Sequence, residues 1–210
     1  ATATAGAFEP KGVVMLMWAL AKMDITPDEA LVEAMQARAL ETAGNFDPQG
    51  VAMLMRALAV MEARLDAGLV VAMQGRAKET AGEFKPREVV HLMRALAKMD
   101  ITPDEALVDA MQARAMETAG DFEPKGVAML MQALAVMETR LDAGLVVAMQ
   151  GRAAATAGDF KSREVVHLMW ALTTMGVVPD VGLVAAMEAR AVSVPEGELT
   201  PQKSEEELRR

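Results

Sequence analysis

The sequence contains no cysteine and no tyrosine, and only two histidines and two tryptophans among 210 residues. Without cysteine, neither disulfide bonds nor thiolate metal sites can form. The sequence has no Ser-His-Asp arrangement, P-loop or dinucleotide fingerprint. It has no run of eighteen apolar residues, so it predicts no membrane-spanning helix. These absences favour a protein that is not an enzyme and that holds no metal and no cofactor.

The five phenylalanines reveal an internal repeat, because each stands 38 residues from the next: Phe8, Phe46, Phe84, Phe122 and Phe160. A fixed period of this length is typical of repeat arrays. No segment has the alternating pattern of a strand. We therefore expect an all-α fold, a right-handed α-solenoid of antiparallel helix pairs with five full repeats and partial terminal repeats.

The repeat also predicts the domain organisation. Residues 1–7 resemble the tail of a preceding repeat, because their ATAG matches the ATAG at 155–158. The chain thus looks like a fragment or a processed piece. Residues 8–197 are expected to form one continuous five-repeat array. Residues 198–210 are polar, and either cap the array or are disordered.

Each repeat predicts two helices. A proline two residues after the phenylalanine suits a first helical turn and predicts a helix such as Lys11–Met23. In copies one and three, Thr26 and Thr102 begin a Thr-Pro-Asp-Glu sequence and are the expected caps of the second helix. In copies two and four the expected caps are Asp66 and Asp142.

The second helix is expected to end near a threonine that is followed by Ala-Gly. A glycine in this place commonly takes a left-handed conformation after the last helical turn. This prediction applies to Gly44, Gly82, Gly120 and Gly158.

Four positions of the first helix never carry an acid, although they differ between copies. They are positions 4, 8, 11 and 15 counted from the phenylalanine, and they lie on one side of the helix, opposite the recurring Val, Leu and Met positions. We call them the basic stripe: Lys11, Met15, Trp18 and Lys22; Gln49, Met53, Arg56 and Val60; Arg87, His91, Arg94 and Lys98; Lys125, Met129, Gln132 and Val136; Arg163, His167, Trp170 and Thr174.

The composition of the basic stripe favours a single-stranded RNA partner. It holds eight of the 21 basic residues and none of the 30 carboxylates. Its side chains can neutralise phosphates, stack on bases and bond to base edges, so we predict that all of them except Val60, Val136 and Thr174 contact RNA. A net charge of −9 argues mildly against this. An ordinary solvated face, with the Met and Trp side chains packed on the neighbouring helix, is the alternative.

An arginine recurs near the end of every second helix: Arg38, Arg76, Arg114, Arg152 and Arg190. It either bonds carbonyl groups or an acid within the fold, or contacts a phosphate. We favour the structural role, because the carboxyl ends of helices attract cations.

The motifs Phe-x-Pro, LMWALAKM (16–23), LMWALTTM (168–175) and Pro-Asp resemble the octotricopeptide repeat. The resemblance covers residues 8–197. It implies sequence-selective binding of single-stranded RNA in a chloroplast or mitochondrion, with roles in transcript stabilisation, processing, splicing or translation and one repeat per nucleotide. Trp18 and Trp170 match the family tryptophan, whereas Arg56, Arg94 and Gln132 depart from it.

Two other interpretations stay open. The array can be a structural scaffold that docks onto other proteins of an organellar complex, such as a ribosome or a photosynthetic assembly, because its Met and Trp residues suit an adaptable protein contact. It can also be an artificial consensus-like array, since the copies are so alike.

Overall fold

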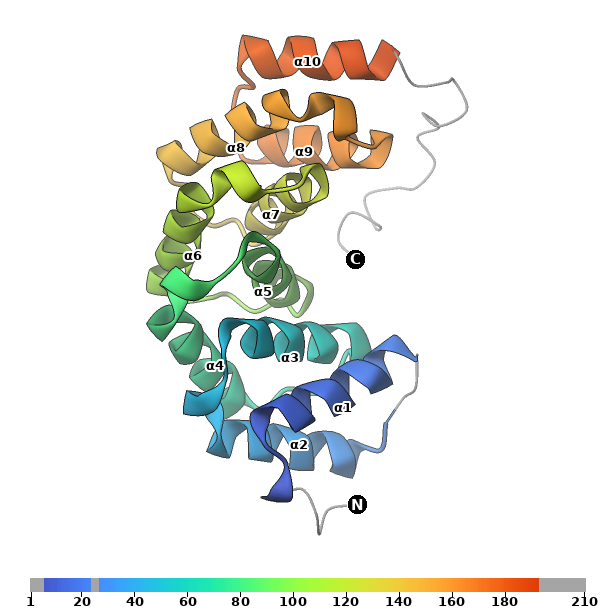
Figure 1. The fold of residues 1–210 in the computed structure, drawn as a ribbon, viewed down its shortest axis with the longest axis vertical. Coiled ribbons are helices and arrows are strands. Elements are labelled where there is room, and N and C mark those ends of the chain that lie inside the picture. Colours follow the sequence, from blue (N-terminus) through green and yellow to red (C-terminus); the bar gives the residue numbers. More distant parts are fainter. Residues whose placement is uncertain (1–5, 24–26, 193–210) are drawn as a thin grey trace. The chain divides into compact units, whose positions relative to one another are not determined.

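The computed structural model describes the fold of residues 6–23 and 27–192, and the side chains of these residues as far as Arg190. Within this part, the chain forms ten α-helices and no strand (Figure 1). The predicted all-α fold is therefore confirmed. The predicted polar tail at 198–210, and residues 1–5 of the predicted preceding repeat, lie outside the described residues.

Each repeat supplies two helices, and in the first four repeats a short 3-10 turn follows the second helix. The first helices are α1 (Pro10–Lys22), α3 (Pro48–Met61), α5 (Pro86–Lys98), α7 (Pro124–Val136) and α9 (Ser162–Thr174). The second helices are α2 (Glu29–Glu41), α4 (Ala67–Glu79), α6 (Glu105–Glu117), α8 (Ala143–Ala155) and α10 (Val181–Val192). The 3-10 turns that follow α2, α4, α6 and α8 are η2 (Ala43–Asn45), η3 (Ala81–Glu83), η4 (Ala119–Asp121) and η5 (Ala157–Asp159).

The chain divides into two compact units, Ala1–Met111 and Gln112–Arg210. In the first unit, α3 packs between α1 and α5, and α2 packs on α4. In the second unit, α7 packs on α9 and α8 packs on α10. Each unit thus stacks first helices on first helices and second helices on second helices, which is the packing of an α-solenoid.

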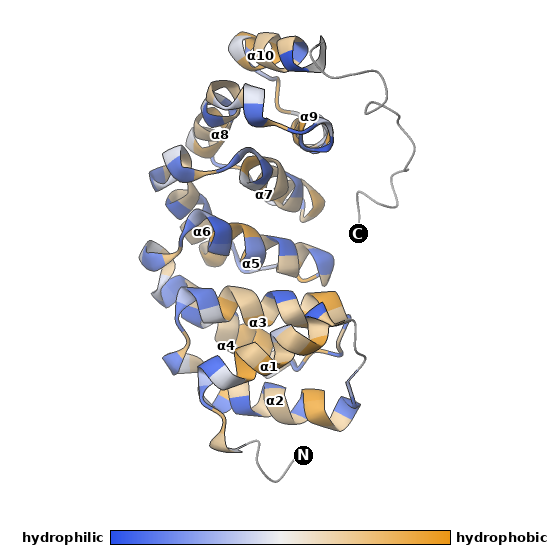
Figure 2. Cartoon of the chain, turned by 45° about the vertical axis from the view of Figure 1, so that its right-hand side comes forward, coloured by the Kyte–Doolittle hydropathy of each residue, from blue (hydrophilic) through white to orange (hydrophobic). Residues whose placement is uncertain are grey.

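The core lies between the two helix layers and is apolar. The recurring positions Val51, Leu54, Met55 and Leu58 are fully buried in α3, and Phe46 is only 1% exposed. Apolar residues dominate α1, α2 and α3 in the hydropathy colouring of Figure 2. These four core positions, predicted by comparing the repeats with one another, are therefore confirmed in α3, whereas Met23, predicted with them as part of the core, is 59% exposed at the end of α1.

An aspartate caps the start of the second helices, including α2, for which a threonine cap was predicted. The carboxylate of Asp28 accepts a hydrogen bond from the Ala30 N–H at 3.1 Å, and that of Asp104 accepts one from Leu107 at 2.8 Å. Helix α6 begins at Glu105, so the predicted cap at Thr102 is wrong; Thr26 lies outside the described residues. A charged acceptor next to the helix start satisfies free N–H groups and suits the helix dipole.

The left-handed residues stand after the first helices, not after the second. Glu62, Asp100, Glu138 and Gly176 have φ angles of 51°, 54°, 51° and 66°. The expectation for Gly44, Gly82, Gly120 and Gly158 is wrong, because these glycines lie in the 3-10 turns. There the Phe46 N–H bonds to the Ala43 carbonyl at 3.2 Å, so the chain leaves the helix without a left-handed residue.

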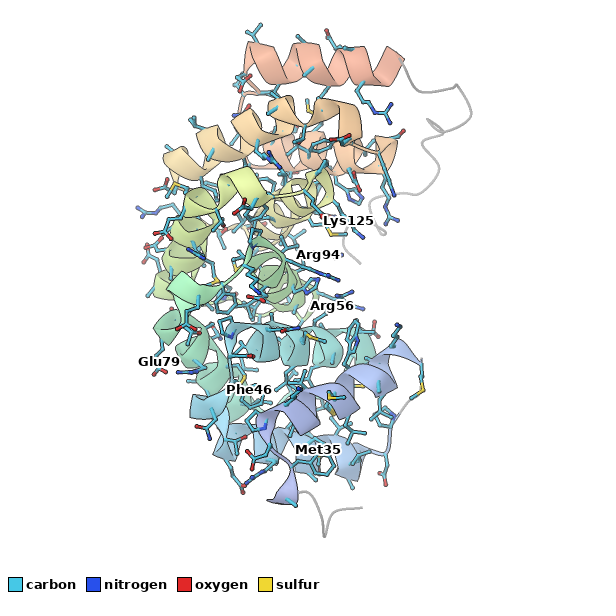
Figure 3. The ribbon with its side chains drawn as sticks, in the orientation of Figure 1. Met35, Phe46, Arg56, Glu79, Arg94 and Lys125 are labelled. Atoms are coloured by element: carbon cyan, nitrogen blue, oxygen red, sulfur yellow. The ribbon has the colours of Figure 1, made fainter. Side chains whose placement is uncertain are left out.

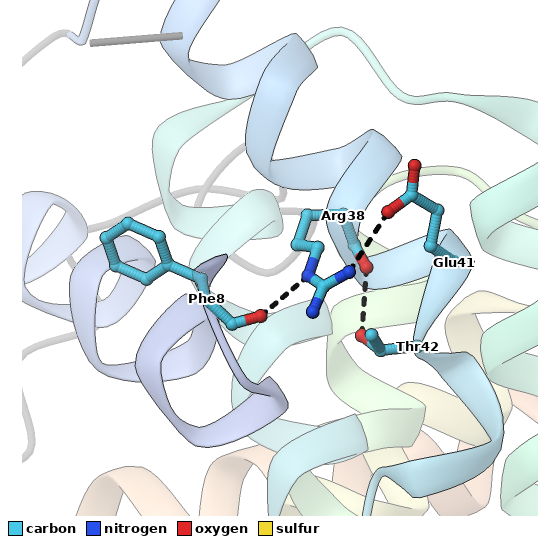
Figure 4. A network of polar contacts seen from close by, with 4 residues as sticks. All are labelled: Phe8, Arg38, Glu41 and Thr42. Carbon is cyan, nitrogen blue, oxygen red and sulfur yellow. Dashed lines mark hydrogen bonds and ion pairs between the residues drawn. The ribbon is translucent and has the colours of Figure 1, made fainter. Parts of the chain in front are cut away.

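The recurring arginines have the structural role that we favoured. Arg38, Arg76, Arg152 and Arg190 donate from Nε to the backbone carbonyl of the phenylalanine that opens their repeat, at 2.6–2.8 Å. Arg38 also pairs with Glu41 at 3.1 Å, and its own carbonyl accepts from the Thr42 hydroxyl at 2.8 Å (Figure 4). These contacts join the start of each first helix to the end of the second helix.

A column of buried glutamines joins one repeat to the next, and the sequence analysis missed it. Gln36 donates from Nε2 to the Arg64 carbonyl at 2.9 Å and accepts from the Asp66 N–H at 2.9 Å. Equivalent bonds to the N–H of the next cap are made by Gln74, Gln112 and Gln150. The sequence feature that could have predicted this column is the recurrence of Gln at one position in four copies. The fifth copy has an exposed Glu188 there.

Replacing Gln36 by leucine is expected to lower the free energy of unfolding by about 2–4 kcal/mol, because it leaves a carbonyl and an N–H without a partner. The matched control is Glu188→Leu, in the same column but exposed, which should change stability by less than about 0.5 kcal/mol. Urea denaturation followed by circular dichroism measures both. Equal effects of the two substitutions would contradict the role of the glutamine column.

One ion pair links second helices within the first unit. Lys78 Nζ lies 2.6 Å from the Asp104 carboxylate, and the two side chains are 35% and 47% exposed. The hydrogen bond from Lys78, with a smaller contribution from the Leu107 N–H, lowers the pKa of Asp104. A lowered carboxylate pKa stabilises the fold above the pKa of the unfolded state, and the gain is lost as the pH falls through the folded-state pKa.

We expect Asp104→Asn to cost about 0.5 kcal/mol at neutral pH, since asparagine still caps the helix and the pair is half exposed. The difference from the wild type should shrink as the pH is lowered below about 4. Denaturation of the wild type, Asp104→Asn, Lys78→Gln and the double variant at several pH values forms a double-mutant cycle. The cycle measures the interaction free energy between Lys78 and Asp104. A difference that persists at acidic pH would show that the charge is not its cause.

Candidate nucleic-acid interface

The basic stripe lies on a solvent-accessible side of the first helices. None of the seventeen predicted RNA contacts is buried, whereas core positions beside them, such as Val51, Leu54 and Met55, are. Arg87, Lys98, Lys125 and Arg163 are exposed. The positions that helical spacing placed on the side of the first helix opposite the core are therefore solvent-accessible in the structure.

In the first unit, the packing of α1, α3 and α5 brings stripe residues of three repeats together. The guanidinium carbon of Arg56 lies 4.7 Å from the centroid of the Trp18 ring. The Arg56 Nη1 atom lies 3.0 Å from His91 Nε2. Figure 3 shows Arg56 and Arg94 on the same side of this unit, while Glu79 of α4 lies at its opposite edge.

The Arg56 guanidinium is positioned by both contacts. A cation within about 6 Å of an indole centroid is attracted to the face of the ring. Because a guanidinium has only N–H donors, His91 Nε2 must accept, which places the imidazole proton on Nδ1. Trp18 thus presents one ring face to a cation of its own fold.

Burial is the main cause that lowers the pKa of Arg56, and the nearby charge of Arg87 adds to it. Arginine nevertheless keeps its charge at neutral pH. Two guanidinium groups thus share this part of the stripe. Such an arrangement attracts an anion or an electronegative base edge.

Other stripe contacts are weaker or lie at the margin. Lys98 pairs with Glu62 at 3.5 Å, so one carboxylate from the end of α3 reaches the edge of the stripe. Gln49 Nε2 lies 3.7 Å from the Met53 sulfur one turn away. The remaining exposed cations of the stripe in the first unit, Lys11 and Lys22, are on α1.

In the second unit, α7 and α9 lie side by side and carry the other half of the stripe. Lys125 and Arg163 are exposed at the first turns of these helices, and Met129, Gln132, His167 and Trp170 are half-buried on them. This unit alone therefore presents two cations together with aromatic and amide groups.

The first unit also has an acidic groove beside α2. A groove of about 580 Å³ between α2 and residues 61–67 is lined by four acids, Glu29, Glu33, Glu62 and Asp66, together with Arg64. Much of the net negative charge thus belongs to the second helices and their turns. The acidity of the whole chain does not describe the charge of the stripe.

Within the described residues, no group of three or more His, Asp or Glu side chains is placed to hold a metal ion. The two histidines lie in different units, and His91 turns one ring nitrogen to Arg56. No helix in the described part of the chain is both long and apolar enough to cross a membrane.

The chain matches a known protein family. The family model described as RNA-editing substrate-binding complex 6 protein matches residues 1–197. Comparison with curated proteins finds no match. This match does not confirm the resemblance to the octotricopeptide repeat.

Proposed function

The chain belongs to the family of RNA-editing substrate-binding complex 6 proteins, and on that premise we propose that it binds single-stranded RNA along its basic stripe without catalysing a reaction. The observation that carries the proposal is the cluster of Trp18, Arg56, Arg87 and His91 on a stripe that contains no acid. In a chain of net charge −9, a solvent-accessible surface of this composition suits a polyanion with exposed bases.

The proposed binding mode divides the work between two kinds of side chain. Exposed lysines and arginines, such as Lys11, Lys98 and Lys125, neutralise phosphates, which supplies affinity that falls with salt. The half-buried aromatic, amide and guanidinium groups meet the bases, which supplies selectivity. The stripe of each unit binds RNA in this way on its own.

The family name gives the proposal its biological setting. We propose that the chain takes part in an RNA-editing complex, with RNA and other proteins as partners. Of the two organelles that the resemblance implies, we retain the mitochondrion. Cell fractionation with an antibody against the chain tests this location.

A protein-binding scaffold is the second candidate, and one observation favours it. Several large apolar side chains are exposed outside any core: Met15 is 62% exposed on the stripe, and Val71 and Val147 are 70% and 71% exposed on the second helices. An apolar protein contact changes little with salt, whereas phosphate binding weakens steeply. A salt titration of binding therefore separates the two candidates.

Replacing Arg94 by alanine tests RNA binding at the stripe. We expect the variant to bind a single-stranded RNA about tenfold more weakly, which corresponds to the loss of about 1.4 kcal/mol. The slope of log affinity against log salt should fall by about 0.7, the value for one phosphate contact on a single strand.

The matched control is Arg64→Ala, which removes the same charge from an exposed site off the stripe. Fluorescence anisotropy at four salt concentrations measures both variants. If Arg94→Ala and Arg64→Ala have the same affinity and the same slope, the stripe is not the RNA surface.

A further inference from the structure

Within the stripe, Arg56 is held on two sides. Its guanidinium carbon stands 4.7 Å from the Trp18 ring centroid, and its Nη1 atom donates to His91 Nε2 at 3.0 Å. Its side chain is half-buried, whereas Arg87, one turn before His91 on α5, is exposed. A side chain restrained in this way loses little conformational entropy when it binds a ligand.

The two restraints leave most of the hydrogen-bonding capacity of Arg56 unused. A guanidinium carries five N–H donors in one plane, and only one of them is given to His91. A flat fork of parallel donors fits a ligand edge with two neighbouring acceptors. The site is therefore built for a ligand of defined geometry, not for a diffuse negative charge.

The charge around Arg56 is not neutralised within the fold. Among the described residues, no carboxylate forms an ion pair with Arg56 or Arg87. The two cations are close enough to repel one another. An electronegative ligand edge beside them would relieve this repulsion.

From this geometry we propose that Arg56 selects a guanine base in single-stranded RNA, by donating two hydrogen bonds to guanine O6 and N7. The inference rests on the proposed function and adds to it the base that this site prefers. Guanine alone presents two adjacent acceptors on this edge. Adenine places an amino group beside N7, and two donors then face each other. Cytosine has an amino group and uracil a single carbonyl oxygen on the corresponding edge.

Trp18 and His91 are positioning residues in this scheme. The indole fixes the plane of the guanidinium, and the imidazole fixes its rotation within that plane. Lysine at position 56 would keep the charge but present a point of charge without a planar fork. A phosphate, in contrast to a base edge, is bound well by either side chain.

The experiment measures affinity of the full chain for four labelled oligouridines by fluorescence anisotropy. Each RNA has one central substituted nucleotide: guanosine, inosine, 7-deazaguanosine or adenosine. Inosine keeps both O6 and N7, 7-deazaguanosine loses N7, and adenosine replaces O6 by an amino group. We expect guanosine and inosine to bind about tenfold more tightly than the other two, as for a bidentate arginine contact.

Three variants locate the preference. Arg56→Lys should remove the discrimination while changing the affinity for plain oligouridine less than about threefold, because the charge is kept. Trp18→Leu should weaken the preference for guanosine and inosine, because the guanidinium of Arg56 loses one of its two restraints. Arg64→Lys, an identical change at an exposed arginine off the stripe, should leave it intact. Circular dichroism confirms that each variant is folded.

The outcomes separate this inference from the proposed function. If the wild type binds all four RNAs equally, guanine selection is wrong and RNA binding stands. If Arg56→Lys keeps the full preference, another residue reads the base and the inference is overturned. If no RNA is preferred by the wild type and Arg56→Lys leaves the affinity for all four RNAs unchanged, Arg56 is a phosphate contact and guanine selection is wrong. If no RNA binds the wild type, the proposed function fails as well.

Discussion

The fold depends on hydrogen bonds that fix the register between and within repeats. Buried Gln36 bonds to the backbone on both sides of the turn that leads into the next second helix. Arg38 joins the two ends of its own repeat through the Phe8 carbonyl. These polar groups are buried or half-buried, so their bonds must be made for the repeat to pack. These hydrogen bonds specify how the repeats are aligned, while the recurring buried apolar side chains supply most of the stabilisation.

The recurring arginines and glutamines take no part in the stripe. The arginine of each second helix is committed to a backbone carbonyl, and the glutamine to the next turn, so neither reaches the stripe. The first helices meet their neighbours through Val, Leu and Met positions. The stripe side of each first helix is not fully buried, and its residues differ between copies.

Comparison of the repeats with one another predicted the helix pairs, the core columns and the accessible stripe. A packed position must recur in every copy, and an accessible one need not, so the sequence itself separates the two. The cap of α6 was missed because Thr102 and Asp104 are both good caps, and only the backbone decides between them. The glutamine column was missed because a polar residue within a helix has the same pattern whether it is solvated or buried.

Contacts between side chains of different repeats were beyond prediction for another reason. The sequence places Trp18, Arg56 and His91 at neighbouring stripe positions, but the spacing of stacked helices alone does not say which pairs meet. The stripe position of Arg56 is a tryptophan in copies one and five, an arginine in copies two and three, and a glutamine in copy four, so stacking and hydrogen-bonding residues both occur at one position. In the first unit the tryptophan of one repeat supports the arginine of the next.

The contact between Arg56 and Trp18 makes the base selectivity of one repeat depend on the stripe residue of the repeat before it. Exposed lysines lose rotamer freedom when they bind and accept any phosphate, so they raise affinity for every RNA equally. A guanidinium already held by an indole and an imidazole has lost that freedom in the folded state. The same charge then contributes mainly to discrimination between ligands. A change at Trp18 therefore acts on what Arg56 recognises, although Trp18 itself need not touch the RNA.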